Sequence, residues 1–316
     1  MQLNKLDFQP FPGLTSGHLQ TIICSFLPAG SSPPSEKWLV DVGNDDFLAC
    51  EVSTPISWQP SDQTVVLVHG MGGSHASSYM IRMAQKFYLN GHKVIRINLR
   101  GCGSGKGLSK LLYHGGTSQD VLKVLQCLKK TAPASEIIVI GFSLGGNIVL
   151  KLAGELGAVA KRLVKTFIAV CAPFDLAEAV RNIQKKRHRL YHFYYLKQIN
   201  AQARTWSSKK IRTLLEFDHL ITAPPWGYKD AFDYYHDCSS IRFLPHIQQT
   251  THLLFAKDDP FICLDSLQKV SLPKAVNLWV TEHGGHVGFL GRPSKTRSLY
   301  WMDDLLLNWI NGDFSH

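Results

Sequence analysis

The sequence predicts an α/β protein built on a mostly parallel sheet with helices on both faces. From residue 64 onward, short runs rich in β-branched residues alternate with longer segments whose apolar residues recur at helical spacing. Such alternation requires right-handed crossovers and a parallel sheet covered on both sides. It stops at about residue 176 and resumes at about residue 251, which predicts a helical insertion. Without a linker or repeat, the 316 residues are expected to form one domain.

The expected elements follow in chain order. Residues 1–35 are interrupted by Pro and Gly and are expected to wrap the domain surface, with a short turn or helix at 17–22. A β-hairpin is expected from the runs 36–42 and 47–52. The other strands, which complete an eight-stranded sheet, are expected at 64–68, 93–98, 136–140, 165–170, 251–255 and 276–281. Helices are expected at 76–89, 117–130, 143–156, 264–270 and 298–310, with the insertion at about 176–248.

Composition narrows the class of protein. Apolar residues make up 45% of the chain, and no run approaches the roughly 20 uninterrupted apolar residues of a membrane span. The seven cysteines are scattered and form no C-x-x-C pair, which favours free thiols in a reducing compartment over disulfides or a zinc site. No secretory leader is expected at the N-terminus. We therefore expect a cytoplasmic protein that holds no metal or cofactor.

The net charge of +10 arises from a single segment. Residues 181–212 contain ten Lys or Arg and no Asp or Glu, and the basic run 185–189 adjoins the aromatic stretch 190–196. Two interpretations stay open. The segment is a solvated helix face over an aromatic core, or it rests on an anionic lipid surface and makes the protein peripheral to a membrane. No nucleic-acid recognition motif accompanies the charge, so a nucleic-acid partner is not expected.

The strongest chemical signal is a G-x-S-x-G turn. The apolar run 136–140 predicts a buried strand, and residues 141–145 (GFSLG) separate it from a predicted helix. Glycines on both sides allow the chain to turn tightly, which holds the serine hydroxyl exposed above the helix N-terminus. This context predicts that Ser143 is a nucleophile.

A serine nucleophile needs a base and an acid, and in this layout they follow it in the order acid, then histidine. Strand 251–255 is followed by Asp258 and Asp259, and strand 276–281 by His283 and His286. We favour Asp259 as the acid, since Pro260 stiffens the turn directly after it, and Asp258 is the alternative. We favour His286 as the base over His283, because the surrounding glycines let it project from a flexible loop.

Two further features complete the predicted site. An oxyanion hole requires two backbone N–H groups aimed at the developing charge. One is expected from Leu144, directly after the nucleophile, and the other from Met71 in the glycine-rich loop after strand 64–68. A metal site at His283 and His286 is disfavoured, because no further ligands stand at a suitable spacing.

These motifs resemble those of the YheT-like α/β-hydrolases, a family that includes animal abhydrolase-domain lipases. The matching stretches run nearly from end to end and include 17–22 (GHLQTI), 98–102 (NLRGC), 113–117 (YHGGT), 141–147 (GFSLGGN), 258–261 (DDPF) and 283–289 (HGGHVGF). The resemblance implies the α/β-hydrolase fold with a helical lid at about 176–248. It also implies a serine carboxylesterase or lipase-like hydrolase with Ser143, Asp259 and His286 as its triad. The lid is least similar to the family, so the substrate is left open.

The sequence thus predicts a serine ester hydrolase that acts on short- to medium-chain acyl esters, with a small-molecule or lipid ester as its substrate. One alternative is a phospholipase or acylglycerol lipase that works at a membrane surface through the basic lid. An alternative of another class is a non-catalytic binding scaffold on the same fold.

Overall fold

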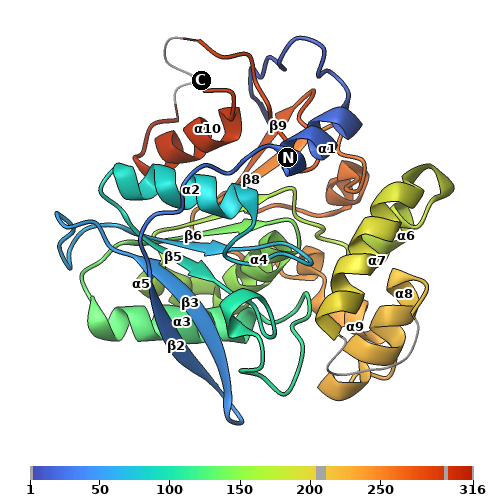
Figure 1. Cartoon of the computed structure of the whole chain (residues 1–316), viewed down its shortest axis with the longest axis horizontal. Helices are drawn as coiled ribbons and strands as arrows, with labels where there is room; N and C mark the ends of the chain where they lie inside the picture. Colours follow the sequence, from blue (N-terminus) through green and yellow to red (C-terminus); the bar gives the residue numbers. More distant parts are fainter. Residues whose placement is uncertain (1–2, 204–210, 295–297, 315–316) are drawn as a thin grey trace.

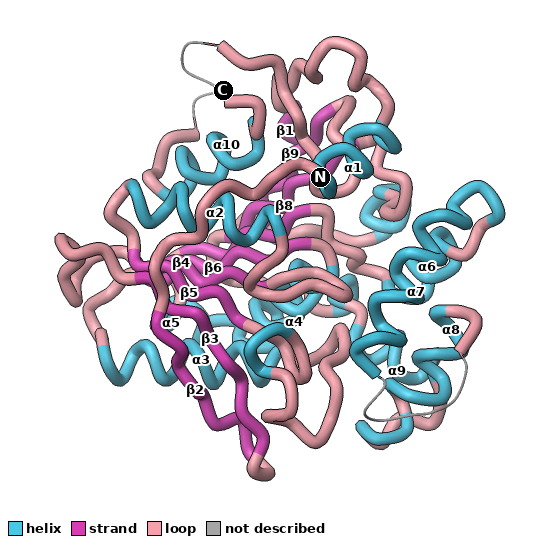
Figure 2. The backbone as a smooth tube through the Cα atoms, in the orientation of Figure 1, coloured by secondary structure: helices cyan, strands magenta, loops and turns pink. Residues whose placement is uncertain are grey.

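The structure is a computed structural model that describes residues 3–203, 211–294 and 298–314. Figures 1 and 2 show a central sheet with helices on both sides of it. Within the described residues the sheet has nine strands, in the order β1-β9-β8-β7-β6-β4-β5-β3-β2. The strands are β1 (Leu3–Lys5), β2 (Glu36–Gly43), β3 (Asp46–Ser53), β4 (Thr64–Val68), β5 (Lys93–Ile97), β6 (Ile137–Phe142), β7 (Thr166–Val170), β8 (Thr251–Ala256) and β9 (Val276–Thr281).

The sheet is mostly parallel, which confirms the predicted fold class. β3 runs antiparallel to β2 and β5, and the other neighbouring strands pair in parallel. The sheet has one strand more than the eight predicted, because β1 pairs in parallel with β9 at the edge. Three residues are too few to show the alternation that reveals a strand in a sequence.

Two apolar cores lie on opposite faces of the sheet, because alternate residues of each strand point to opposite sides. In β4, Val65 and Leu67 belong to the core covered by α2 (Ser78–Leu89) and α10 (Trp301–Ile310). Val66 and Val68 belong to the core covered by α3 (Ser118–Thr131) and α4 (Leu144–Leu156). α5 (Ala160–Leu163) follows α4 and leads toward β7.

The chain between β7 and β8 is helical, as predicted. It forms α6 (Leu176–Ile183), α7 (Arg189–Ala203), α8 (Leu214–Phe217), a π-helix (Asp218–Thr222) and α9 (Ala231–Cys238). These helices gather on one side of the molecule in Figure 1. Three of the ten basic residues in the segment 181–212, at positions 204, 209 and 210, lie outside the described residues. The predicted helix at 264–270 is a 3₁₀ helix (Leu264–Lys269).

The expected turn or helix at 17–22 is the start of α1 (Gly17–Phe26). Figure 1 shows α1 between the N-terminus and α7. Among the described helices, none combines the length and the apolar character needed to traverse a bilayer.

Candidate active site

Ser143 occupies a sharp turn between β6 and α4. Its backbone has φ 51° and ψ −122°, a conformation that side-chain-bearing residues rarely adopt. The flanking glycines make the turn possible, since a Cβ on Gly141 would lie 2.3 Å from the Gly145 carbonyl oxygen. A Cβ on Gly145 would lie 2.3 Å from the Val68 carbonyl oxygen. The predicted strand, turn and helix are therefore present, with the half-buried Ser143 at the carboxyl end of β6.

His286 and Asp259 form a hydrogen-bonded chain with Ser143. His286 Nε2 lies 2.8 Å from Ser143 Oγ, and His286 Nδ1 lies 2.8 Å from Asp259 Oδ2. The other carboxylate oxygen of Asp259 accepts the backbone N–H groups of Phe261 at 2.8 Å and Ile262 at 3.1 Å. Because both oxygens of Asp259 are held, the imidazole has a fixed partner on the side away from Ser143.

Asp258 and His283, the alternatives for the acid and the base, lie beside each other. Asp258 accepts the Gly285 N–H at 2.8 Å, and its other oxygen lies 3.4 Å from His283 Nδ1. Burial raises the pKa of Asp258. Asp258 therefore braces the loop that carries His286, whereas Asp259 contacts the imidazole itself.

Helix α1 supports the same loop, and the sequence motifs gave no physical reason to expect this. The Thr21 hydroxyl accepts the backbone N–H of His286 at 2.8 Å. The fully buried Gln20 accepts the Leu290 N–H at 2.6 Å and donates to the Leu290 carbonyl at 3.0 Å. The signal was the segment GHLQTI, whose polar residues at 20 and 21 stand among apolar neighbours.

In the loop after β4, the Met71 N–H has no acceptor among the described residues. The Gly70 carbonyl accepts His69 Nδ1–H at 2.8 Å and the Gly73 N–H at 3.1 Å. The Met71 N–H belongs to the same planar peptide and points the opposite way. Neither it nor the Leu144 N–H donates to any group among the described residues. Both groups thus remain available at the predicted oxyanion hole.

Two tyrosines hold the neighbouring peptides of this loop. The Gly70 N–H donates to the Tyr79 hydroxyl at 2.9 Å, and the Gly72 N–H donates to the Tyr113 hydroxyl at 2.8 Å. Burial raises the pKa of Tyr79 to about 12, so its hydroxyl stays neutral. Burial also lowers the pKa of His69 to about 4, which keeps its ring neutral at physiological pH. The loop is therefore fixed before any substrate arrives.

Two cavities meet at Ser143, and both are also lined by His286 and Met71. The first, called here the apolar cavity, has a volume of about 870 Å³ and is walled mainly by apolar residues of α6, α7 and α8. The second, called here the polar cavity, has a volume of about 980 Å³. Its wall comes from α1, the loop after β4, the start of α2, and α7, and includes Thr21, Ser25, Ser77, Ser78 and Gln198.

One group of possible metal ligands overlaps this site. Ligand atoms of Cys171, Asp259 and His286 lie within 4.8 Å of one another. Burial holds the pKa of the Cys171 thiol well above its usual value, so the thiol stays protonated and is a poor metal ligand. The Asp259 and His286 atoms are already hydrogen-bonded to each other. The geometry fits a proton-transfer chain better than a metal centre.

Comparison with known proteins identifies the family. A family model described as the alpha/beta hydrolase fold matches residues 63–293. The chain belongs to the α/β hydrolases. The YheT protein of Escherichia coli K12, whose name describes it as a candidate esterase, is 29% identical to this hydrolase over 96% of the chain and 93% of its own length. The predicted resemblance to YheT-like α/β hydrolases is confirmed, and the hydrolase is an enzyme of the esterase and lipase type.

Other relatives agree with this placement. A monoacylglycerol lipase of Saccharomyces cerevisiae is 29% identical over 74% of this chain and 56% of its own length. The human monoacylglycerol lipase ABHD2 is 24% identical over 94% of this chain and 77% of its own. Among solved structures, a Pyrococcus furiosus esterase aligns with a TM-score of 0.58 at 17% identity, covering 82% of this chain and 85% of that one. This likeness supports the fold.

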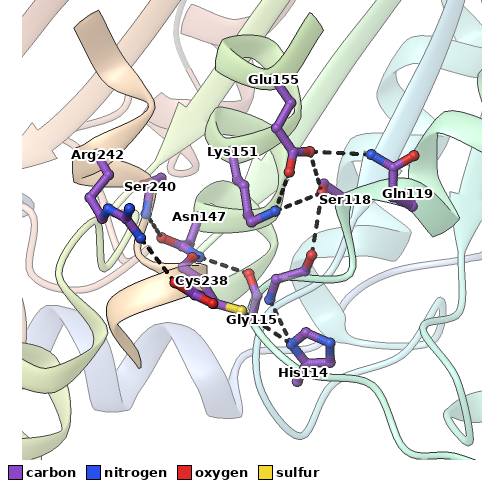
Figure 3. A network of polar contacts seen from close by, with 12 residues as sticks. His114, Gly115, Ser118, Gln119, Asn147, Lys151, Glu155, Cys238, Ser240 and Arg242 are labelled. Carbon is purple, nitrogen blue, oxygen red and sulfur yellow. Dashed lines mark hydrogen bonds and ion pairs between the residues drawn. The ribbon is translucent and has the colours of Figure 1, made fainter. Parts of the chain in front are cut away.

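Asn147 ties helix α4 of the hydrolase to the insertion. Figure 3 shows its amide between two segments: Nδ2 donates to the Gly115 and Cys238 carbonyls at 2.8 and 2.9 Å, and Oδ1 accepts the Ser240 N–H at 2.8 Å. Asn147 is fully buried in α4, one turn after Ser143. It therefore fixes the end of α9 and the loop before α3 against the elbow.

Replacing Asn147 with Asp should destabilise the hydrolase strongly. An ionised aspartate cannot donate to the two carbonyls and would bury a charge beside them. We expect the free energy of unfolding in urea to fall by roughly 2–4 kcal/mol. Asn308→Asp, at an exposed position of α10, is the matched control and should change it by less than ~0.5 kcal/mol. Equal effects of both substitutions would contradict the role given to Asn147.

Proposed function

We propose that this protein is a serine ester hydrolase with Ser143, His286 and Asp259 as its catalytic triad. The observation that carries the proposal is the unbroken chain from Ser143 Oγ through the imidazole to Asp259, with 2.8 Å at each step. The free N–H groups of Met71 and Leu144 beside it support an oxyanion hole. The names of the relatives, a candidate esterase and two monoacylglycerol lipases, support a carboxylic ester as substrate.

The reaction follows from this geometry. His286 Nε2 takes the proton of Ser143 Oγ as the oxygen attacks the ester carbonyl, and Asp259 stabilises the imidazolium. The N–H groups of Met71 and Leu144 donate to the oxyanion. The intermediate collapses to an acyl-enzyme, and the departing alcohol receives the proton from His286. Water then attacks with His286 as base, which releases the acid and restores the serine.

The two cavities suggest how the ester lies. The apolar cavity suits the acyl chain, because burial of methylene groups there is favourable. The polar cavity, with its hydroxyl and amide groups, suits the alcohol part. In this proposal an acyl chain of short to medium length occupies the apolar cavity. In this proposal the helices α6 to α9 are a lid within a single hydrolase domain, since α6, α7 and α8 wall the acyl side.

The adjacent aspartates provide an internally matched test of the triad. Asp259→Asn should reduce kcat for p-nitrophenyl butyrate on the order of 10³-fold or more. The neutral amide neither holds the imidazole in the required tautomer nor stabilises the imidazolium. Asp258→Asn should reduce kcat less than tenfold, since the Asp258 carboxylate contacts Gly285 and His283 in the supporting loop. Ser143→Ala should reduce kcat at least ~10³-fold.

Three results would argue against this assignment. A larger loss in Asp258→Asn than in Asp259→Asn would transfer the acid role to Asp258. Activity of Ser143→Ala equal to that of the wild type would end the serine mechanism. Thermal unfolding of each variant provides the control, because a folded but inactive Ser143→Ala protein is what the proposal requires.

A second candidate function is lipid hydrolysis at an anionic membrane surface, which the outer face of α7 favours. Leu190 and Phe193 expose 80% and 68% of their surface, and the preceding Lys186 and Arg187 are exposed. Phe26 at the end of α1 is 80% exposed. The two helices touch through the Tyr191 hydroxyl, 3.1 Å from His18 Nδ1, and together they line the polar cavity.

This arrangement suits a lipid surface for a physical reason. Apolar and aromatic side chains insert at the level of the head groups, while nearby cations attract anionic lipids. The polar cavity lies between the two helices, so an ester in the surface would be near Ser143. The free state of all seven cysteines supports a reducing compartment, so the cytoplasmic side is the expected location.

Vesicle binding tests the surface. Wild-type protein should partition more strongly to phosphatidylcholine vesicles containing phosphatidylglycerol than to phosphatidylcholine alone. Replacing Lys186 and Arg187 with Gln should weaken binding about tenfold or more, at about 1 kcal/mol per cation. The matched control replaces Lys123 and Lys130, exposed on α3, with Gln and should leave binding unchanged. Equal binding to both vesicle types, or equal loss in both double variants, would rule out the surface.

A further inference from the structure

Asp218 places a carboxylate in the wall of the apolar cavity. The residue begins the π-helix of the insertion (Asp218–Thr222), and the same cavity is lined by Ser143 and His286. The Thr222 hydroxyl donates to Asp218 Oδ1 and the Tyr235 hydroxyl donates to Oδ2, each at 2.7 Å. Both donors are themselves buried. The rotamer of the carboxylate is thus fixed from one side by two neutral hydroxyl groups.

The Asp218 carboxylate has no compensating cation in the part of the chain that the structure describes. Among the described residues, no Lys, Arg or His forms an ion pair with Asp218. Burial raises its pKa to about 6, so it is ionised through most of the neutral range. Burying an unpaired charge is unfavourable, and proteins seldom keep one without a functional reason.

The free side of Asp218 faces the cavity. Thr222 and Tyr235 are buried and donate hydrogen bonds to Asp218. Asp218 itself is partly exposed and is part of the cavity wall. Each carboxylate oxygen can accept about two hydrogen bonds and has one from the protein side chains. Acceptor capacity therefore remains on a surface that is otherwise mainly apolar.

We propose that Asp218 is a substrate-binding residue that accepts a hydrogen bond from a hydroxyl group on the acyl chain, so that hydroxyacyl esters are the preferred substrate class. This inference rests on the proposed function, in which the acyl chain enters the apolar cavity. A plain chain leaves the carboxylate desolvated and unmatched, whereas a hydroxyl at the right depth supplies the missing donor. An acyl chain that bears its own carboxylate is repelled.

A purely apolar cavity would behave in the opposite way. Exchanging a hydrogen for a hydroxyl would then lower kcat/KM, because the hydroxyl loses its water and gains no partner. A site built to bind a hydroxyl discriminates in its favour, often by more than tenfold. The direction of the preference thus separates a substrate-binding role for Asp218 from a structural role that only holds Thr222 and Tyr235.

Competition between matched esters tests the proposal. Wild-type protein would receive methyl decanoate mixed with one of five analogues that carry a single hydroxyl at carbons 6 to 10, and the released acids would be quantified by mass spectrometry. We expect kcat/KM for at least one analogue to exceed that of methyl decanoate about tenfold. The preference should fall several-fold in Asp218→Asn, which presents a neutral amide in the same place. Asp237→Asn, an exposed carboxylate of α9 outside the cavity wall, should keep the wild-type preference.

Every outcome of this experiment bears on the proposal. If methyl decanoate is hydrolysed in a Ser143-dependent way but no hydroxylated analogue is preferred, the inference is wrong and the proposed function stands. If Asp218→Asn keeps the preference, another residue binds the hydroxyl and the inference is again wrong. If Asp218→Asn does not fold, the wild-type panel still decides, since a preference above one supports the subsite. If no ester is hydrolysed at all, the proposed function fails and this inference fails with it.

Discussion

The arrangement of the site depends on one backbone constraint, the positive φ of Ser143 between β6 and α4. An L-residue reaches this conformation only where the surrounding chain enforces it. Here β6 enters with the Ser143 N–H bonded to the Val170 carbonyl, and α4 leaves with the Ser143 carbonyl accepting two N–H groups. Gly145 allows α4 to approach β4, and Gly141 allows β6 to approach α4, within distances that a Cβ would not permit. The close packing around the elbow therefore lifts the hydroxyl into the space where the two cavities meet.

Segments far apart in the chain converge on that hydroxyl. Asp259, His286 and the Met71 loop each follow the carboxyl end of a parallel strand, so they lie along one edge of the sheet. Each loop is then braced by groups that do not touch the hydroxyl: α1 holds the loop of His286 through Thr21, and Tyr79 and Tyr113 hold the Met71 loop. Such bracing keeps donors and acceptors oriented in advance, which is where much of the catalytic power of such sites resides.

Much of this could be read from the sequence, and the exceptions have physical causes. Strand-helix alternation predicted the parallel sheet, and the elbow predicted the position of Ser143, because both depend on local pattern. The sequence pattern favoured Asp259 through Pro260 but left Asp258 open, since the two are adjacent and differ in which loop atoms face them. The brace from α1 and the two tyrosines was not predictable either, because each contact joins residues brought together by the fold. Strand β1 is too short to show a period, and the place of Asp218 in the cavity wall depends on the fold.

The central claim is that the chain holds an activated serine at position 143, and reaction with an alkyl fluorophosphonate tests it most directly. Only a serine with a general base within hydrogen-bond reach reacts readily with such a reagent. Mass spectrometry of the digested protein should locate a single phosphonyl adduct on the peptide containing Ser143. The adduct should form with wild type and be absent when His286 is replaced by Ala. An unmodified Ser143 in folded wild-type protein, or labelling that does not require His286, would contradict the account.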